Sequence, residues 1–251
     1  MKSTLRTLLP PLTMAAVFLI GWQLLHVLAK SDEISSPVET VALLVRMMET
    51  VRFWQDVAET GLAFVWALLL SMAFGTALGI VLGLSRPTGD AVEPILVAFY
   101  SLPKVTLYPL VLLAFGLGMS AKVAFGVMHG LVPITLLTRN AISQLKPVYL
   151  RSAQVMRLTR AQVALKVVLP AIFPELVAGT RIGFSLSLLG VLIGEMFASK
   201  RGLGFAAVSA MGLGDIKTIL AIGVFLAAFA VAANSGMLML ERSLRHKSAG
   251  R

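Results

Sequence analysis

One uninterrupted apolar segment constrains the fold of this chain more than any other feature. From Thr60 to Ser85, 26 consecutive residues carry no formal charge. About 20 apolar residues are enough to cross the hydrocarbon core of a bilayer. Over the 251 residues, 57% are hydrophobic and only 14% are charged, which is too apolar for a soluble domain. The sequence therefore predicts an all-α integral membrane protein.

Five further segments complete a predicted set of six transmembrane helices in a single domain, 1–251. A cleaved signal peptide is the alternative for the first segment, but the apolar core of such a peptide is normally about 7 to 15 residues long. An additional amphipathic helix is expected on the outer surface at 37–53, where apolar residues recur at helical spacing after Pro37. The spans are expected at about 7–29, 60–85, 94–118, 122–139, 174–198 and 217–240.

The distribution of basic residues predicts the orientation of the bundle. If both termini are inside, the cytoplasmic segments hold 13 lysines and arginines against four acids, whereas the outer segments hold seven of each. Short, positively charged loops stay on the cytoplasmic side, so the N and C termini are expected there. The formal net charge of +10 does not indicate nucleic-acid binding, because the basic residues lie at the ends of apolar segments.

The segment 146–170 is a basic insertion between two apolar blocks. Between Arg139 and Pro174 the chain has six basic residues and no acidic one. An ordinary cytoplasmic loop is the alternative on charge alone. Helical periodicity and the Leu169-Pro170 stop instead favour a folded cytoplasmic element on which a partner docks. The residues expected on its packed face are Ala153, Met156 or Val155, Ala164, Val167 and Val168, with Arg151, Arg157 and Arg160 mostly elsewhere.

Glycines spaced four residues apart recur within the predicted spans. Small residues at this spacing allow helix backbones to approach closely in lipid. Each pair alone is weak evidence because glycine is common in membrane helices, but together they favour a tightly packed bundle. The positions are Gly75/Gly79/Gly83, Gly126/Gly130, Gly179/Gly183 and Gly190/Gly194.

Charged and titratable side chains mark the third, fourth and fifth predicted spans as the ones that line a pathway. A charge near the membrane centre costs about 2.5 to 3.5 kcal/mol on insertion scales, so it should face protein or water. Lys104 is either a pathway cation or an internally paired or snorkelling side chain. Arg181 and Glu195 lie too far apart on one helix to pair and are expected to anchor neighbouring spans. His129 is expected to make an interhelical hydrogen bond, with a titrating role as the alternative.

No reaction chemistry is indicated by the sequence. It contains no Walker A motif, no Gly-x-Ser-x-Gly and no His-Glu metal pattern. Cysteine is absent and the three histidines are scattered, so thiolate chemistry and a metal site are not expected. The chain is therefore not predicted to be an enzyme, and active transport would draw energy from another chain or from an ion gradient.

Short motifs recur in the third span, around the fifth span and in the basic segment. They are Pro103-Lys104-Val105, Tyr108-Pro109-Leu110 and Phe115-Gly116-Leu117-Gly118 in the third span, Gly179-Thr180-Arg181, Gly194-Glu195-Met196 and Gly202-Leu203-Gly204 around the fifth, and Val167-Val168-Leu169-Pro170 in the basic segment. Together they resemble the motifs of ABC importer permeases of the nitrate, taurine and alkanesulfonate family, and Ala153 falls on the last alanine of that family's pattern. Two positions in the basic segment depart from the pattern: Arg151 stands where Glu is usual, and Arg157 where Gly is usual.

The resemblance implies a type I importer permease in the bacterial inner membrane. Such a permease normally pairs with a second copy of itself, binds two cytoplasmic ATPase subunits and receives solute from a periplasmic or lipid-anchored binding protein. ATP and Mg²⁺ would be bound by the ATPase, with no cofactor in this chain and no nucleic-acid partner. The ATPase-coupling residues it implies are Arg151, Ala153, Arg157, Arg160, Leu169 and Pro170, and the candidate pathway or gate residues are Lys104, Tyr108, His129, Arg181 and Glu195.

The solute and two competing functions stay open at this level. Lys104 and Arg181 favour an anion of the sulfonate or nitrate type, although the family also carries neutral and cationic compounds. An ion-coupled secondary transporter would show paired broken helices in two related halves, and these are not found. A membrane scaffold whose basic segment binds anionic lipid or a soluble partner is the third hypothesis, and Arg151 and Arg157 keep it open.

Overall fold

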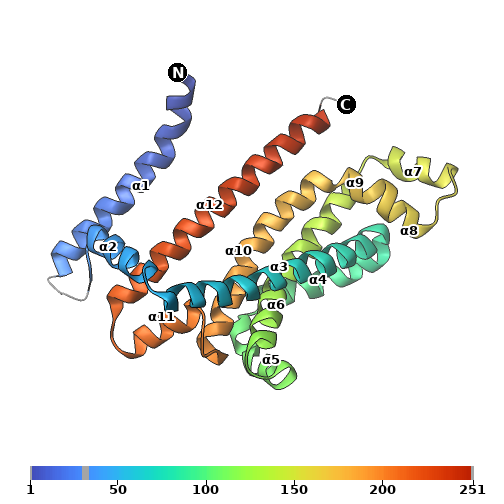
Figure 1. Ribbon diagram of the computed structural model, residues 1–251. Helices are drawn as coiled ribbons and strands as arrows, with labels where there is room; N and C mark the ends of the chain where they lie inside the picture. The colour runs from blue at the N-terminus through green and yellow to red at the C-terminus, as the bar shows by residue number, and fades with distance from the viewer. Residues whose placement is uncertain (1, 30–33, 250–251) are drawn as a thin grey trace. The chain divides into compact units, whose positions relative to one another are not determined.

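The computed structural model describes residues 2–29 and 34–249, and all regular secondary structure in these ranges is helical (Figure 1). The chain forms two compact units, one of Met1–Gln55 with Ala206–Phe229 and one of Asp56–Phe205 with Ala230–Arg251. The helices are α1 (Lys2–Ala29), α2 (Pro37–Met48), α3 (Val51–Leu84), α4 (Arg86–Ser101), the 3₁₀ helix η1 (Lys104–Leu107), α5 (Tyr108–Phe115), α6 (Met119–Ser143), α7 (Pro147–Val155), α8 (Arg160–Gln162), the π-helix η2 (Val163–Val168), α9 (Leu169–Ala171), α10 (Phe173–Ala198), α11 (Leu203–Gly212) and α12 (Ile216–Ala249).

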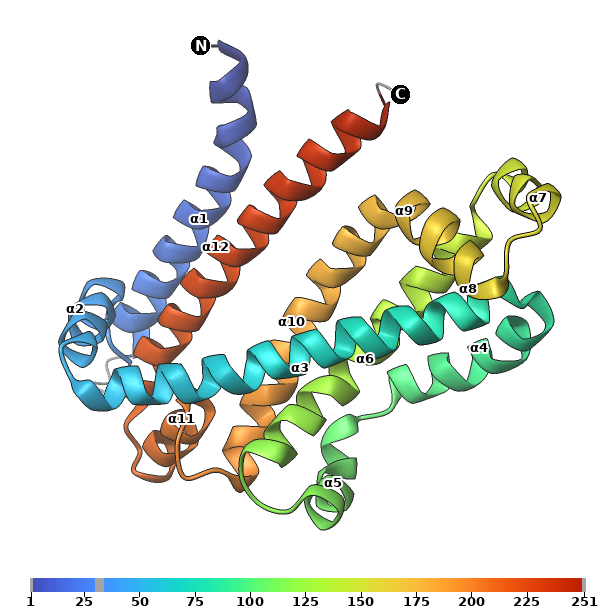
Figure 2. The same ribbon diagram turned by 45° about the vertical axis from the view of Figure 1, so that its right-hand side comes forward.

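Helices α3, α6 and α10 form the core of the larger unit, as Figure 2 shows. Gly75 of α3 lies against Leu131 of α6, and Gly83 lies against Ile142. Residue numbers therefore rise in the same direction along both helices, which run parallel. Helix α10 meets α6 in the opposite order, with Gly183 at Ile134 and Gly194 at Lys122, and is antiparallel to it.

Close backbone approach between these helices depends on the spaced glycines. A Cβ atom on Gly79 would lie 2.5 Å from the Cβ of Thr138, and one on Gly126 would lie 2.6 Å from the Cβ of Ala67. A Cβ on Gly190 would lie 2.8 Å from the carbonyl oxygen of Phe125. Real Cβ atoms are not found at such distances, so larger residues would force the helices apart. The predicted tight packing through small residues is confirmed.

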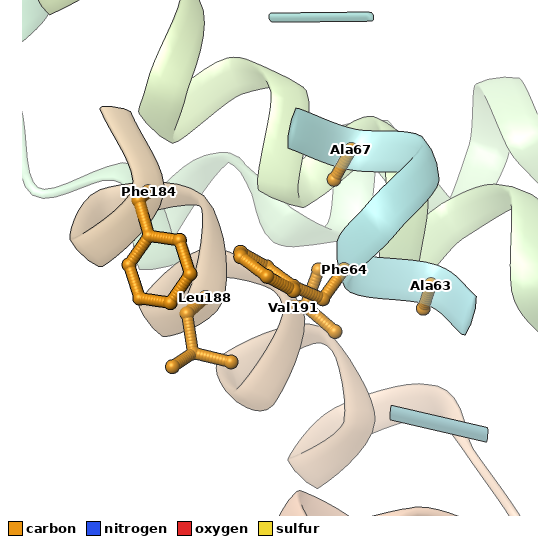
Figure 3. Packing of buried hydrophobic residues seen from close by; sticks show 6 residues of the cluster. All are labelled: Ala63, Phe64, Ala67, Phe184, Leu188 and Val191. Atoms are coloured by element: carbon orange, nitrogen blue, oxygen red, sulfur yellow. The ribbon is translucent and has the colours of Figure 1, made fainter. Parts of the chain in front are cut away.

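An apolar cluster fills the space between α3 and α10 (Figure 3). The rings of Phe64 and Phe184 meet edge to face, with centroids 4.8 Å apart at 83°. This is the arrangement that aromatic quadrupoles favour. Partly buried residues of α12, Ala233 and Met237, pack against the same cluster. The C-terminal half of α12 is thereby part of the larger unit.

A second apolar cluster joins the C-terminal end of α6 to the segment that follows it. Its buried members are Ala141, Ile142, Val168 and Ile172. Partly buried side chains of α3 and α7, including Ile80 and Leu84 from α3 and Leu150 from α7, pack around them. Residues 146–170 are therefore attached to the bundle at the end where α3 and α6 both finish.

Helix α2 of the smaller unit ends earlier than the predicted amphipathic helix 37–53. It begins with Pro37 after a capping box between Ser36 and Glu39 and stops at Met48. The predicted C-terminal boundary is wrong because Thr50 starts a new helix: its Oγ1 accepts a hydrogen bond from the amide of Phe53 at 3.3 Å. On α2, Val38 is 78% exposed.

Four helices in the described residues are long and apolar enough to cross a membrane, and a bent pair raises the number to five. The four are Val51–Leu84, Met119–Ser143, Phe173–Phe197 and Ile216–Met239. The predicted first span, 7–29, falls on α1, in which side chains are described only from Thr13 to Leu28, and that stretch alone is shorter than the roughly 20 residues that a span needs. Six spans therefore stay a prediction.

The predicted third span, 94–118, is not one straight helix. Helix α4 and the segment Lys104–Phe115 meet at an angle of 92°. Pro103 forces the residue before it out of helical geometry, and Leu102 has φ −65° and ψ 139°. The helix also starts before the predicted span, because α4 already begins at Arg86, with a proline in its first turn.

Candidate functional site

Residues 146–170 form a sequence of short, well-capped helices. Helix α7 ends in a Schellman motif: the amide of Leu158 donates to the carbonyl of Ala153 at 3.1 Å, and the amide of Arg157 donates to the carbonyl of Gln154 at 3.0 Å. Arg157 takes the left-handed position of this motif, with φ 52°. Glycine normally fills that position because it has no Cβ, so an arginine there is strained.

The next turn of the 146–170 element is fixed by a second cap and by Pro170. Thr159 and Gln162 form a capping box at the start of α8. The chain continues as the π-helix η2 into Leu169 and Pro170. A proline clashes with the carbonyl four residues earlier in a regular α-helix, and wider π turns accommodate it. Val168 is fully buried and ties this part to the bundle.

The outward face of α7 combines apolar and basic side chains. Val148, Arg151 and Val155 follow the i, i+3, i+7 spacing of one helix face and are all exposed, Val155 by 85%. Met156, directly after the helix, is 69% exposed. The expectation that Val155 or Met156 would lie on the packed face is wrong. Ala153, as expected, is buried, and Leu150 packs against the bundle.

Five of the six basic residues in this region are exposed and unpaired within the described part of the chain: Lys146, Arg151, Arg157, Arg160 and Lys166. Arg139 is the sixth and has a different role. Its guanidinium lies 2.6 Å from the carboxylate of Asp90 and 2.9 Å from that of Glu93, both in α4. These ion pairs hold the start of α4 against the end of α6.

A buried polar cluster lies at the opposite end of the three-helix core. Glu195 of α10 has no exposed surface. Its carboxylate accepts hydrogen bonds from the hydroxyl of Thr60 at 2.8 Å and from the amide of Gly204 at 3.0 Å. The ammonium of Lys122 lies 3.6 Å from Glu195 and 2.8 Å from Glu59. We call Asp56, Glu59, Thr60, Lys122 and Glu195 the Glu195 cluster.

The Glu195 cluster holds the turn that follows α10. The carboxylate of Asp56 accepts from the amide of Gly202, and the hydroxyl of Thr60 accepts from the amide of Leu203, both at 2.8 Å. Gly202 has φ 113°, and a Cβ there would collide with the carboxylate of Glu195. The Gly-Leu-Gly motif is thus required by backbone conformation and by close approach to a buried carboxylate.

Most of the Glu195 cluster was missed by sequence reasoning. Lys122, Glu59 and Asp56 were counted with the charges of the outer segments and were not expected to pair, yet the side chain of Lys122 is 1% exposed. A usable signal was present: Glu59 directly precedes one predicted span, Lys122 is the first residue of another, and Glu195 lies near the end of a third span that runs in the opposite direction. Three such charges reach the same depth in the bundle and can pair.

The candidate pathway residues do not form one site. The ammonium of Lys104 donates to the carbonyl of Tyr100 at 2.9 Å and lies 5.1 Å from the centroid of that ring. Lys104 is 8% exposed and makes no ion pair with any described residue. Arg181 lies at the other end of α10, where its guanidinium is 3.6 Å from the carboxylate of Glu241 in α12.

Tyr108 and His129 are brought together by Phe125. The hydroxyl of Tyr108 donates to the carbonyl of Gly194 at 2.8 Å, and its ring meets that of Phe125 at 4.9 Å. His129 Nδ1 bonds the carbonyl of Phe125 at 2.9 Å. That hydrogen bond lies within α6, so the expected interhelical bond is not the one that the structure shows. Among the described residues no group of three or more His, Asp or Glu could hold a metal ion.

Comparison with known families decides between the three hypotheses. Residues 75–246 match the family described as the binding-protein-dependent transport system inner membrane component. The chain belongs to this family. It is a permease component of an inner-membrane importer and not an enzyme, and the matched region runs from α3 through the 146–170 element into α12.

Individual relatives agree with this assignment. The permease is 29% identical over 203 residues to a probable ABC transporter permease of Haemophilus influenzae, covering 81% of this chain and 83% of that one. It is 29% identical to the taurine transport system permease TauC of Escherichia coli, covering 76% and 70%, and 24% identical to the nitrate import permease NrtB of Synechococcus elongatus, covering 80% and 76%. A chain of the MetNI methionine ABC transporter, in an inward-facing conformation, shares the fold with a TM-score of 0.67 at 19% identity, over 75% of this chain and 94% of that one.

Proposed function

We propose that two copies of this permease form the channel of an ATP-driven importer, and that a cytoplasmic ATPase subunit docks on the 146–170 element of each copy. One observation carries the docking proposal: a compact helical element presents five unpaired cations and exposed apolar side chains away from the bundle. Apolar side chains that are exposed together among polar residues are typical of a surface that binds another protein. The sequence has no nucleotide-binding motif, so ATP and Mg²⁺ belong to the ATPase.

The opposite end of the core is the proposed entry side for solute from a binding protein. There the Glu195 cluster fixes the turn 199–204, so Glu195 is proposed to be a positioning residue and not a solute contact. Arg181 is proposed to have a similar anchoring role through Glu241. The structure supports this division because the side chain of Glu195 is fully enclosed by protein partners.

The proposed solute is a small anion of the sulfonate or nitrate type. The permeases TauC and NrtB, which are named for taurine transport and nitrate import, are among the relatives of this chain. Lys104 is the residue that favours an anion, since it is a buried lysine without a carboxylate partner in the described chain, at the break of a bent span. Tyr108 and His129 are proposed to line the same region of the bundle.

Uptake into proteoliposomes tests the proposed function. The permease is reconstituted with candidate ATPase subunits and a purified binding protein, and radiolabelled taurine and nitrate are supplied outside with ATP inside. We expect uptake to require ATP hydrolysis and to stop with an ATPase whose catalytic glutamate is changed to glutamine. Uptake that continues with the inactive ATPase, and that follows an ion gradient instead, identifies a secondary transporter. A membrane scaffold would give no uptake with any combination of subunits.

A further inference from the structure

The 146–170 element carries charge of one sign only. Its five exposed basic residues have no acidic neighbour in sequence between Arg139 and Pro174, and Arg139 itself is neutralised by α4. The nearest acid along the chain is Glu175 in the first turn of α10, and no ion pair joins it to these five residues in the described chain, while Asp90 and Glu93 are paired with Arg139. A surface whose electrostatic potential has one sign favours a partner whose surface potential has the opposite sign, and it raises the rate of their association.

Apolar side chains lie among these charges. Val155 and Met156 are 85% and 69% exposed at the end of α7, with Arg151 one turn before them and Arg157 directly after. Interfaces between proteins commonly have an apolar centre and a charged rim. The Schellman motif and the capping box fix the backbone that carries these side chains, which reduces the entropy lost when a partner binds.

We infer that the ATPase surface that receives the 146–170 element is an apolar pocket for Val155 and Met156 bordered by carboxylates that pair with Arg151 and Arg157. This inference rests on the proposed docking of an ATPase and adds the chemistry of its binding surface. Because complementary carboxylates are needed, this permease discriminates against ATPases whose surface is basic at that place.

An anionic membrane surface is the other partner that five cations suit. Helices that lie on lipid turn their apolar face to the acyl chains and their cations to the headgroups. In α7 the continuous apolar face, with Leu150 and Ala153, is already used against the bundle. The outward face alternates apolar and basic residues, which suits a protein pocket with a charged rim better than a lipid surface.

Charge reversal tests the inference on the assembled complex in detergent. The partner is the ATPase that supports uptake in the reconstitution above, and its dissociation constant is measured by titration. Arg151→Glu and Arg157→Glu are each expected to weaken binding at least tenfold, to about a tenth of the wild-type affinity or less, because like charges then face each other. Arg151→Lys should bind nearly as wild type. Arg201→Glu, an exposed charge reversal at the opposite end of the core, is the matched control and should not change binding.

Arg157→Gly distinguishes the effect of the arginine charge on binding from its effect on backbone strain. It relieves the left-handed strain at φ 52° and removes the cation, so the variant should be at least as stable as the wild type and still bind the ATPase more weakly. Raising the salt from about 0.05 M to about 0.5 M should weaken wild-type binding and affect Arg157→Gly less.

Other outcomes would overturn the inference in distinguishable ways. If Val155→Asp abolishes binding while both arginine reversals bind as wild type, docking at this element stands and the acidic rim is wrong. If the reversals leave ATPase binding unchanged but abolish binding of short-chain phosphatidylglycerol to the permease in detergent, the cations serve lipid. If no ATPase binds the wild type at all, the proposed function fails before the inference is reached.

Discussion

Arg157 shows how a single residue can be placed against its own conformational preference. It stands at the position of the α7 Schellman motif where glycine is favoured, with φ 52°. Left-handed geometry costs a residue with a Cβ roughly 1–2 kcal/mol. A side chain kept at that cost points to a requirement for its charge, which agrees with the proposed contact to a partner.

The strain at Arg157 gives a first prediction. Arg157→Gly should raise the free energy of unfolding of the larger unit by up to about 1 kcal/mol, since part of the relief is offset by the greater freedom of glycine in the unfolded chain. Denaturant unfolding in detergent, followed by tryptophan fluorescence, measures it. Arg151→Gly is the matched control: in the helix interior it should lower stability by about 1 kcal/mol. Equal destabilisation by both variants would contradict the assignment of strain.

Glu195 gives a second prediction at the scale of one side chain. Glu195→Ala leaves the hydroxyl of Thr60 and the amide of Gly204 without their buried acceptor and removes one of the two carboxylates beside Lys122, and should cost about 3–5 kcal/mol. Glu195→Gln keeps an acceptor and should cost less. Thermal stability in detergent checks both, with exposed Lys200→Ala as the control expected within about 0.5 kcal/mol of the wild type. A Glu195→Ala variant as stable as this control would remove the cluster's structural role.

At the scale of helices, the contact between α3, α6 and α10 depends on glycine where neighbouring backbones meet. A Cβ on Gly126 would lie 2.6 Å from the Cβ of Ala67, which cannot move without its helix, and 2.7 Å from a methyl of Val191, whose χ1 is restricted in a helix. By contrast, a Cβ on Gly61 of α3 would meet nothing within 4 Å.

These two glycines make a matched pair of variants. Gly126→Ala should destabilise by about 1–3 kcal/mol through overpacking. Gly61→Ala should stabilise by about 0.5–1 kcal/mol because alanine favours the helix and no neighbour is displaced. Thermal unfolding of both variants in the same detergent is the measurement. Opposite signs are the expected result, and two equal shifts would show that the helices are not held by contact at Gly126.

Helix α12 begins with a cap whose strength depends on pH. Asp215 accepts hydrogen bonds from the hydroxyl of Thr218 at 2.6 Å and from its amide at 3.0 Å, and these bonds lower the pKa of the Asp215 carboxyl from its usual 3.8. Because the pKa of Asp215 is lower in the folded than in the unfolded state, the cap contributes its full stabilisation above pH 3.8. This contribution is lost as the pH falls through the pKa of the folded state.

Removing this cap gives a prediction for the element. Asp215→Ala should lower the free energy of unfolding by about 1 kcal/mol at pH 7. The difference between wild type and variant should narrow below pH 3.8, where the wild-type carboxylate becomes protonated. Unfolding curves at a series of pH values measure both effects. A difference that grows as the pH falls would have the wrong sign for a capping carboxylate.

Prediction from sequence succeeded where a local pattern determines a contact and failed where the partner is distant. Gly75, Gly79 and Gly83 are spaced four residues apart, which places them on one face of a helix. This local pattern was enough to predict close packing against a neighbouring helix. Lys122 was misplaced because hydropathy treats a charge at the end of a span as exposed, and its partners Glu59 and Glu195 lie 63 and 73 positions away in the chain.

For the 146–170 element, too, some predictions from sequence were right and others were wrong. Periodicity indicated a folded segment and put Ala153 on its packed face, where it is buried. The same periodicity misplaced Met156, because the helix ends at Val155 and the chain turns left-handed two residues later. The start of α4 at Arg86 was hidden by the proline, glycine and charges of its first turns, which are compatible with a loop as well as with a helix start.

At the scale of the whole molecule, the two ends of the core differ in charge and predict an orientation. The sequence contains no cysteine, so single cysteines can be introduced without removing any. Ser152→Cys, in the exposed part of α7, should react with a membrane-impermeant maleimide only from the cytoplasmic side. Lys200→Cys, in the turn after α10, should react only from the outside. Right-side-out and inside-out vesicles distinguish the two, and the reverse pattern would invert the proposed topology.

The close backbone contacts of α6 with α3 and α10 at the spaced glycines have a mechanical consequence. Helices whose main chains are in contact at several successive turns cannot slide or rotate past one another without a clash. We therefore expect α3, α6 and α10 to move as one rigid body, so that a displacement imposed at one end of these helices is transmitted to the other end. Flexing has to be accommodated elsewhere, and the right-angled corner after Ser101 is the place where the helical hydrogen-bond ladder is already interrupted.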